Sequence, residues 1–337
     1  MRIAVDVMSG DHGCSVVIEG VKQALEADKS IAALYLVGNE AEIHSACKTA
    51  QFHDKRVHVV HASEVLTMDE DPLKVRRKKD SSMMRAIELV SDAKADGIIS
   101  PGNTGALVAG SMKLGRLEGV KRPAIAARMP SRTQDFVLLD AGANDACEPL
   151  HLAQFAVMGN IYARVVLGVA RPRVGVLSNG SEETKGTDLT REAAKLCHQL
   201  DLNFIGYVEG FDLFNDAVDV VVTDGFTGNV VLKTAESLGY AIGSILKAEL
   251  KASPMRQVGA FLAKGGLMKL KKRMDPEVYG GAVLLGLNGT VIKAHGSSRE
   301  RSIANAIRVA AEEIRHGVDQ IISQQIAQAN DRLAVTA

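Results

Sequence analysis

The feature that most limits the fold is a repeated arrangement of a short apolar strand, a loop rich in Gly, Asn and Thr, and then a helix. Segments 97–106, 174–187 and 219–229 all follow this arrangement. Strands that alternate with helices predict βαβ units with right-handed crossovers and a mostly parallel sheet. Helix N-termini at the carboxyl edge of such a sheet offer free N–H groups to anions. We therefore expect these loops to converge on one edge and to form a phosphate site.

Composition narrows the class of protein. The chain has no Trp and only 4% aromatic residues, so its core must come from aliphatic side chains and Met, as in helix-covered parallel sheets. Lys and Arg (40) balance Asp and Glu (40), which gives no argument for a nucleic-acid partner. The four cysteines lie far apart and are read as reduced thiols of a cytosolic protein. Since Met1 runs directly into a strand, we expect no signal peptide and a cytoplasmic location.

The order of the expected elements supports one doubly wound α/β domain over residues 1–337. Two segments around a turn-rich break, 124–128 and 136–140, predict a local antiparallel pair. Asn288-Gly289 predicts a hairpin between 282–285 and 290–293. One long helix is expected over about 298–328. The other expected strands are 2–7, 34–37, 57–61, 97–100, 173–177, 204–208 and 218–223.

Residues 237–273 depart from this rhythm and predict a projecting helical hairpin. Its tip carries the apolar residues Val258, Phe261 and Leu262, and its return arm is basic. One interpretation is an arm that packs in a homodimer, and a second adds contact between the tip and an anionic membrane. The basic residues are candidates for contact with an acidic carrier protein or a membrane. They are Lys264, Lys269, Lys271, Lys272 and Arg273.

Several loops, in order, resemble those of one enzyme family. Segment 6–11 (DVMSGD) resembles the D-x-M-G-G-D opening of the bacterial phosphate acyltransferases, the acyl-ACP:phosphate transacylases of phospholipid synthesis. Segment 100–106 (SPGNTGA) is similar to their S-A-G-N-T-G-A loop, and 138–144 (LLDAGAN) to their L-L-D-x-G-A-N. Further similar loops are 182–186, 208–212, 223–229 and 280–296. Ser9, Pro101 and Tyr207 depart from the family pattern.

This resemblance implies a fold related to phosphotransacetylases and isocitrate dehydrogenases, and a homodimer. It implies that phosphate attacks the thioester of a long-chain acyl-ACP, giving acyl phosphate and free acyl carrier protein (ACP). Peripheral contact with the inner face of the plasma membrane and a downstream glycerol-phosphate acyltransferase would fit this pathway. Phosphate is already a nucleophile, so the chemistry needs no catalytic triad, metal or cofactor.

Within the matching loops we assign candidate roles. Lys185 and Asn229 are candidates for holding phosphate or the oxyanion, His295 for protonating the departing thiolate, and Asp224 for orienting a neighbour. Each has an alternative role: Lys185 as a solvated loop residue, Asp224 as a turn residue and His295 as a structural hydrogen-bonding group. The candidate phosphate- or substrate-binding residues are Asn103, Thr104, Gly105, Thr227, Gly228, Asp6, Asp11, Asp140 and Asn144.

Three rival functions stay open at this point. A short-chain phosphotransacetylase acting on acetyl-CoA would share the chemistry but not the apolar arm. A nucleotide-dependent dehydrogenase would use a similar sheet, but no clean G-x-G-x-x-G follows the first strand. A non-catalytic phosphate- or membrane-binding scaffold would not need so many small-residue loops.

Overall fold

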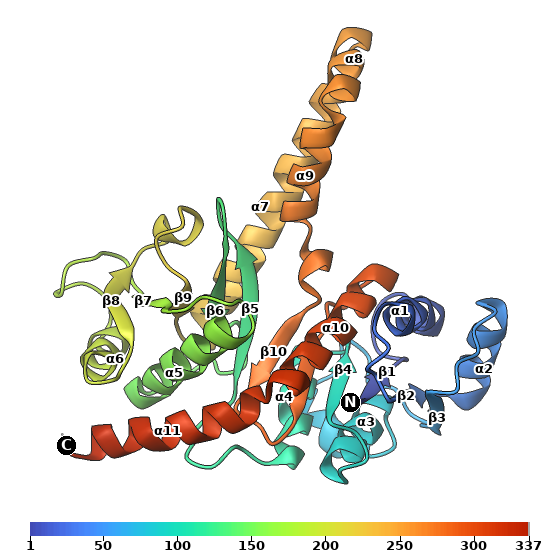
Figure 1. Ribbon diagram of the computed structural model, residues 1–337, viewed down its shortest axis with the longest axis horizontal. Coiled ribbons are helices and arrows are strands. Elements are labelled where there is room, and N and C mark those ends of the chain that lie inside the picture. Colours follow the sequence, from blue (N-terminus) through green and yellow to red (C-terminus); the bar gives the residue numbers. More distant parts are fainter. Residues whose placement is uncertain (336–337) are drawn as a thin grey trace.

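The computed structural model describes residues 1–335 and places eleven strands in one continuous sheet (Figure 1). The order across the sheet is β3-β2-β1-β4-β11-β10-β5-β6-β9-β7-β8. The last two strands of the chain, β10 and β11, therefore lie near its centre. The strands are β1 (Arg2–Asp6), β2 (Ala33–Gly38), β3 (Val57–His61), β4 (Gly97–Ser100), β5 (Ala124–Pro130), β6 (Asp135–Leu139), β7 (Arg173–Leu177), β8 (Asn203–Val208), β9 (Val220–Val222), β10 (Ala282–Leu285) and β11 (Thr290–Lys293).

The strands form two parallel groups that run in opposite directions. One group is β3, β2, β1, β4 and β11, and the other is β6, β9, β7 and β8. Between them, β11–β10, β10–β5 and β5–β6 are antiparallel. The carboxyl ends of the two groups therefore point to opposite edges of the sheet. The expectation that the phosphate-site loops converge on one edge is wrong, because pairing between distant strands reverses the direction. Asp6 and Asp11 follow a strand of the first group, and Asp140 and Asn144 follow a strand of the second.

Helices cover both faces of the sheet, which confirms the predicted doubly wound α/β class. On one face, α1, α2, α5, α6, α10 and α11 pack against strand residues such as Val5 and Val222. On the other face, α3, α4 and the first turns of α7 pack against residues such as Ile98 and Phe136. The helices are α1 (Gly13–Ala27), α2 (Glu40–Thr49), α3 (Ser82–Ser91), α4 (Thr104–Ser111), α5 (Pro149–Val165), α6 (Asp188–His198), α7 (Gly225–Lys251), α8 (Pro254–Leu262), α9 (Lys264–Met274), α10 (Glu300–His316) and α11 (Val318–Val335).

The C-terminal region contains two helices and not the single helix expected over 298–328. Gly317 separates α10 from α11 and has a φ of +62°, a left-handed conformation that glycine adopts without a Cβ penalty. The Gly317 N–H donates to the carbonyl of Ile314, which closes the end of α10. α11 then crosses beside α5, far from the start of α10 (Figure 1).

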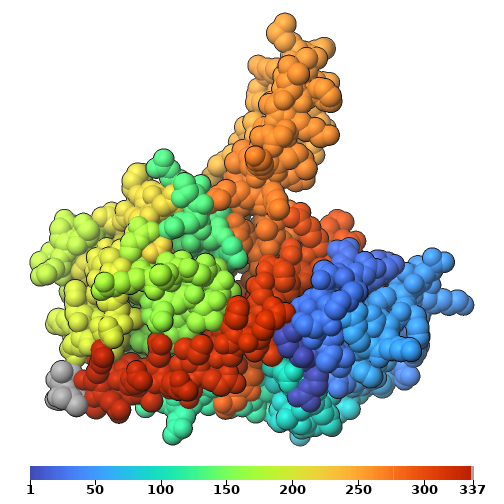
Figure 2. Space-filling model, viewed as in Figure 1, coloured from blue at the N-terminus to red at the C-terminus, as the bar shows by residue number. Residues whose placement is uncertain are grey.

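A helical arm projects from the body of the molecule (Figure 2). α7 leaves the sheet as the helix that follows β9 and continues outward, α8 forms the tip, and α9 returns. This confirms the predicted hairpin, although its outward helix begins at Gly225 and so belongs to a βα unit. Neither α8 nor α9 has a buried residue. Among residues 1–335, no helix has the length and apolar character that crossing a bilayer requires.

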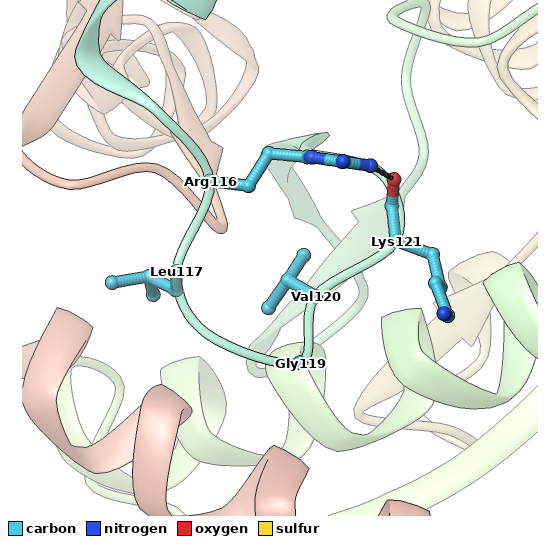
Figure 3. A pocket seen from close by; sticks show the side chains of 5 residues that line it. All are labelled: Arg116, Leu117, Gly119, Val120 and Lys121. Carbon is cyan, nitrogen blue, oxygen red and sulfur yellow. Dashed lines mark hydrogen bonds between the residues drawn. The ribbon is translucent and has the colours of Figure 1, made fainter.

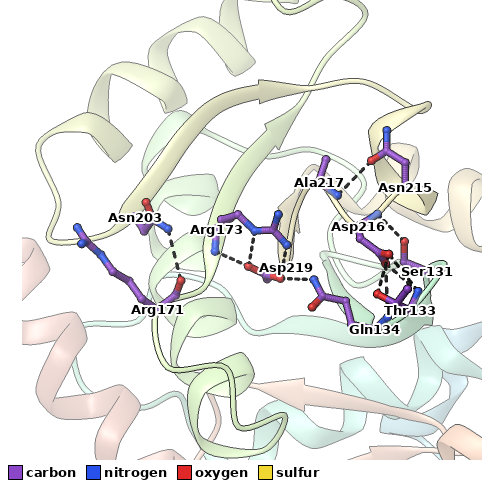
Figure 4. A network of polar contacts seen from close by, with 10 residues as sticks. All are labelled: Ser131, Thr133, Gln134, Arg171, Arg173, Asn203, Asn215, Asp216, Ala217 and Asp219. Atoms are coloured by element: carbon purple, nitrogen blue, oxygen red, sulfur yellow. Dashed lines mark hydrogen bonds and ion pairs between the residues drawn. The ribbon is translucent and has the colours of Figure 1, made fainter.

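The base of the arm is fixed by a turn between β5 and β6. Arg273 donates to the carbonyl oxygens of Ser131 (2.7 and 3.0 Å) and Gln134 (3.0 Å). The turn is also held by Asp216, whose carboxylate accepts bonds from the backbone N–H and hydroxyl of Thr133 (Figure 4). Arg273 therefore anchors the arm, whereas the sequence placed it among residues that contact a membrane or a carrier protein.

Candidate active site

The first group of predicted loops lies at the carboxyl ends of β1, β4 and β11. Asp6 is fully buried and accepts hydrogen bonds from the Ser100 hydroxyl (2.7 Å) and from the N–H groups of Met8 and Ser9 (3.3 and 3.2 Å). The Ser100 hydroxyl in turn accepts a bond from the Gly102 N–H (3.1 Å). Asp6 thus shapes the loops after β1 and β4, and its oxygens are occupied by protein donors.

The N-terminus of α4 carries three of the predicted phosphate-binding residues. Asn103 caps this helix, since its Oδ1 accepts a bond from the Ala106 N–H (3.0 Å) and its Nδ2 donates to the Met68 carbonyl (3.0 Å). The backbone N–H groups of the next two residues, Thr104 and Gly105, are at the start of the helix, so no earlier carbonyl of the helix accepts a bond from them. The Asn103 side chain is therefore occupied by capping, while the backbone of the following two residues provides donors for an anion.

Asp11 and His295 meet at the carboxyl end of β11. The Asp11 N–H donates to the Gly296 carbonyl (2.9 Å). His295 Nδ1 lies 2.7 Å from the Ser297 hydroxyl and 3.2 Å from the Ser297 backbone nitrogen. His295 Nε2 lies 3.3 Å from Lys233 Nζ on α7. Desolvation and the charge of Lys233 lower the pKa of His295.

The second group of loops begins after β6 with Asp140. Its carboxylate accepts five hydrogen bonds of 2.8–3.1 Å from the N–H groups of Ile125, Gly142, Ala143 and Asn144 and from the Asn144 amide. Burial raises the pKa of Asp140, and these donors oppose the rise. Asn144 is buried and also donates to the Pro123 carbonyl (2.7 Å). Both side chains therefore form the internal frame of this loop.

The start of α7 packs directly on that frame. Asp224 caps the helix, because its carboxylate accepts bonds from the N–H and hydroxyl of Thr227 (both 2.8 Å). At Gly228, an added Cβ would lie 1.9 Å from the Asp140 carbonyl oxygen. No larger residue fits at this position without moving the backbone. Asp224, Thr227 and Gly228 thus fix where α7 begins.

One face of α7 connects the two groups of loops. Asn229 is exposed and lies beside Gly142, whose added Cβ would be 3.4 Å from the Asn229 side chain. Lys233 and Glu236 follow by four and seven residues, which places them on the same face of the helix. Lys233 pairs with Glu236 (2.8 Å) and contacts His295. Although the strand ends lie on opposite edges, α7 thereby links Asn229 to His295.

Lys185 lies in the loop after β7, next to the strand that leads into Asp224. Its side chain is exposed, and its methylene carbons lie near Gly180. Asn179 Oδ1 accepts a bond from the Gly186 N–H (2.9 Å), which folds the loop back on itself. Lys185 therefore joins the second group of loops and has no direct contact with the first.

One hollow of the described molecule lies away from these loops. It has a volume of about 360 Å³ and is lined by Arg116, Leu117, Gly119, Val120 and Lys121, in the connection from α4 to β5 (Figure 3). Arg116 donates to the Lys121 carbonyl across it. None of the predicted site residues borders this hollow.

The chain is similar to known proteins over nearly its whole length. Residues 1–321 match the family described as "Fatty acid synthesis protein". The phosphate acyltransferases of Geotalea daltonii and Bacillus pumilus are each 45% identical to this chain, over 328 and 329 residues. The alignments cover 97% of this chain and 94% and 98% of the two relatives. The chain belongs to the phosphate acyltransferase family. It is therefore an acyltransferase of lipid synthesis.

Solved structures support the fold of the family. A phosphotransacetylase from Streptococcus pyogenes superposes with a TM-score of 0.63 at 18% identity, covering 94% of both chains. The 4-hydroxythreonine-4-phosphate dehydrogenase of Klebsiella pneumoniae gives 0.53 at 15% identity, covering 93% of this chain and 99% of that one. At these identities the similarity shows the fold alone, and it confirms the predicted relation to phosphotransacetylases.

Three charged residues near the loops were missed from the sequence: Lys233, Glu236 and Lys293. The first two could have been found from Asn229, since residues four and seven positions later share its helix face. Lys293 ends β11 and lies close to the Pro101 carbonyl (3.4 Å). Lys293 could have been found as a candidate site residue, because it ends an apolar strand and lies two residues before His295.

The tip of the arm has the exposure that its predicted contacts would need. Phe261 and Leu262 are 74% and 80% exposed, and Val258 is also exposed. The lysines of the return helix are exposed too: Lys264, Lys269, Lys271 and Lys272.

Proposed function

We propose that this acyltransferase moves a long-chain fatty acyl group from acyl-ACP to inorganic phosphate. A phosphate oxygen attacks the thioester carbonyl, a C–O bond forms, and the C–S bond breaks. The ACP thiolate leaves and takes up a proton, and the other product is an acyl phosphate for phosphatidic acid synthesis. The relatives named phosphate acyltransferase support phosphate and an acyl donor as the two substrates.

The observation that carries this proposal is the row of Asn229, Lys233 and Glu236 on α7. The row reaches from the loop after β6 to His295 after β11, so one helix face can present donors to both reactants. Phosphate is an anion, and both the ammonium group of Lys233 and the free N–H groups of α4 can donate hydrogen bonds to it. In this proposal, Asn229 and Lys185 stabilise the oxyanion that develops on the carbonyl.

His295 is suited to the departing thiolate. Ser297 holds the ring through Nδ1, so Nε2 is the ring nitrogen that faces Lys233. Because a thiolate has an ordinary pKa near 8.5, it needs only a modest proton donor. Proton transfer from His295 is therefore an aid to the reaction and not its main driving force.

The arm supports the proposed partners and location. Its exposed apolar tip with adjacent lysines suits the inner, anionic face of the plasma membrane, and the basic return helix suits an acidic ACP. The exposed apolar face of α7 suits a homodimer. A cytoplasmic enzyme held at the membrane in this way would deliver acyl phosphate to a glycerol-phosphate acyltransferase.

The experiment is phosphate-dependent release of free ACP from palmitoyl-ACP, run beside palmitoyl-CoA and acetyl-CoA. Fast, phosphate-dependent turnover of palmitoyl-ACP supports the proposal. Preference for acetyl-CoA would place the protein with the short-chain phosphotransacetylases. Phosphate binding without turnover of any thioester would favour a scaffold.

A further inference from the structure

Lys293 is a largely buried lysine whose charge has no acidic partner. Its Nζ donates to the main-chain carbonyl oxygens of Pro101 (3.4 Å) and Ala294. Among residues 1–335, no carboxylate forms an ion pair with it. Because a buried ammonium group without a counter-charge is costly, this arrangement needs a physical explanation.

Two of the three neighbouring carboxylates are already used by other groups. Asp6 accepts bonds from Ser100 and two backbone N–H groups, and Glu236 pairs with Lys233 at 2.8 Å. Desolvation and then the charge of Lys233 lower the pKa of Lys293 to about 8, against the opposing charges of Asp11, Asp6 and Glu236. Lys293 thus has no direct ion pair, although the charges of these three carboxylates oppose the fall in its pKa.

The surroundings of Lys293 also offer hydrogen-bond donors to an anion. The Pro101 carbonyl that it contacts belongs to the loop that begins α4, and the N–H groups of Thr104 and Gly105 open that helix. Lys233, on α7, lies 3.3 Å from the side chain of His295, which is two residues after Lys293. An anion at this point would gain two ammonium groups and a helix N-terminus and would relieve the uncompensated charge.

We propose that Lys293 and Lys233 form the cationic side of an anion subsite beside the N-terminus of α4, occupied by inorganic phosphate. The assignment to phosphate rests on the proposed function, but the subsite itself rests on the unpaired lysine. The shared chemistry is a phosphate group, which could also come from the phosphodiester of a carrier's pantetheine arm. The test must separate these two sources.

The test is binding of inorganic phosphate to the full-length protein without an acyl donor, by calorimetry. Lys293→Met keeps the length and the apolar stem of the side chain and removes the charge. We expect its phosphate dissociation constant to rise at least about tenfold, since losing one buried charged partner is among the larger single effects on binding. Lys233→Met should also raise the phosphate dissociation constant. Because Lys233 is exposed, this second variant tests the subsite even if Lys293→Met fails to fold.

The matched control is Lys22→Met. Lys22 also donates to a backbone carbonyl, that of Ala50 (3.0 Å), but lies far along α1 from the loops. The phosphate dissociation constant of Lys22→Met should equal that of the wild type. Phosphate should also raise the thermal midpoint of the wild type and of this control, and much less that of Lys293→Met.

A folded Lys293→Met that binds phosphate as the wild type does would overturn the subsite. The same measurement with holo-ACP, whose pantetheine arm carries the phosphodiester, supplies the second arm. If Lys293→Met lost binding of holo-ACP while keeping phosphate binding, the assignment to inorganic phosphate would be wrong. If phosphate bound through Lys293 but no thioester were turned over, the subsite would stand and the proposed transacylation would fail.

Discussion

The buried ammonium of Lys293 makes the stability of the phosphate-free protein depend on pH. Its pKa is about 8 in the folded state against 10.5 for the free side chain. Between these values the unfolded chain holds more protons, so the free energy of unfolding should rise with pH in this window. Relative to Lys293→Met, we expect a gain on the order of 1–3 kcal/mol between neutral pH and about pH 10.

Urea unfolding of both proteins at the two pH values measures this difference. The groups that face Lys293, namely Lys233, His295, Asp11, Asp6 and Glu236, are the same in both proteins and largely cancel. Parallel pH profiles would mean that Lys293 does not titrate in this window.

Lys185 and Asn229 are the residues whose removal should affect turnover most. Both side chains are exposed, so Lys185→Ala and Asn229→Ala should change stability by less than about 1 kcal/mol. Each should lower kcat by about 10²-fold or more, as removal of an oxyanion donor does. Steady-state assays with palmitoyl-ACP decide this, with Lys48→Ala on α2 as the control for loss of an exposed lysine. Full activity in both variants would contradict their assignment.

At this scale the sequence identified the loops but not the task of each side chain. Asp6 and Asp140 were predicted to line a pocket, yet protein donors occupy their oxygens. A motif cannot reveal this, because the donors come from chain segments up to 94 residues away. Lys293 was missed because its burial depends on β4 and α7, which are also distant in sequence.

Among the elements, the first turn of α7 tolerates change least. An added Cβ at Gly228 would collide with the Asp140 carbonyl, whereas at Gly243, on the same helix, it would meet nothing within 4 Å. Gly228→Ala should therefore destabilise the protein by about 2–4 kcal/mol, or prevent folding, since the backbone cannot yield cheaply. Gly243→Ala should stabilise it by about 0.5–1 kcal/mol through helix propensity.

Thermal and urea unfolding of the two variants compare them directly. Equal stabilities would show that α7 can shift away from the loop after β6. In that case the packing of Gly228 on Asp140 would not fix the position of Asn229, Lys233 and Glu236 on α7.

Local patterns were sufficient for most elements. Segments 57–61, 97–100, 173–177, 282–285 and 290–293 were predicted with the bounds that the structure has. The hairpin of β10 and β11 could be predicted because the turn signal, Asn288-Gly289, consists of two adjacent residues. The break at Gly317 was missed, since a glycine within a continuous apolar pattern is compatible with an unbroken helix. The reversal of strand direction was missed because β10 pairs with β5, over 150 residues earlier in the chain.

For the whole molecule, the unpaired surface of the arm predicts association. Leu238, Ile242 and Ile245 lie on one face of α7 and are 58%, 46% and 64% exposed in the single chain. In the proposed homodimer this face would be covered. Leu238→Glu with Ile245→Glu should therefore convert the dimer to a monomer, as measured by sedimentation velocity. A wild-type monomer at micromolar concentration would contradict the dimer itself.

The tip of the arm should act separately from its base. Phe261→Asp with Leu262→Asp removes apolar area and adds negative charge, so binding to vesicles containing anionic lipids should fall by about tenfold or more. Sedimentation of the protein with such vesicles measures the binding. As a control, the variant should remain a dimer. Unchanged vesicle binding would move the membrane contact away from the tip.

The position of β10 and β11 at the centre of the sheet also has a consequence for the order of synthesis. The ribosome produces β1 to β9 first, and these strands can form only two separate half-sheets, ending at β4 and at β5. Each half-sheet keeps an open edge until residues 282–293 are made and join them. Unpaired edges recruit other chains, so a nascent chain stalled shortly before this hairpin would be more prone to aggregation than either a shorter or a finished one.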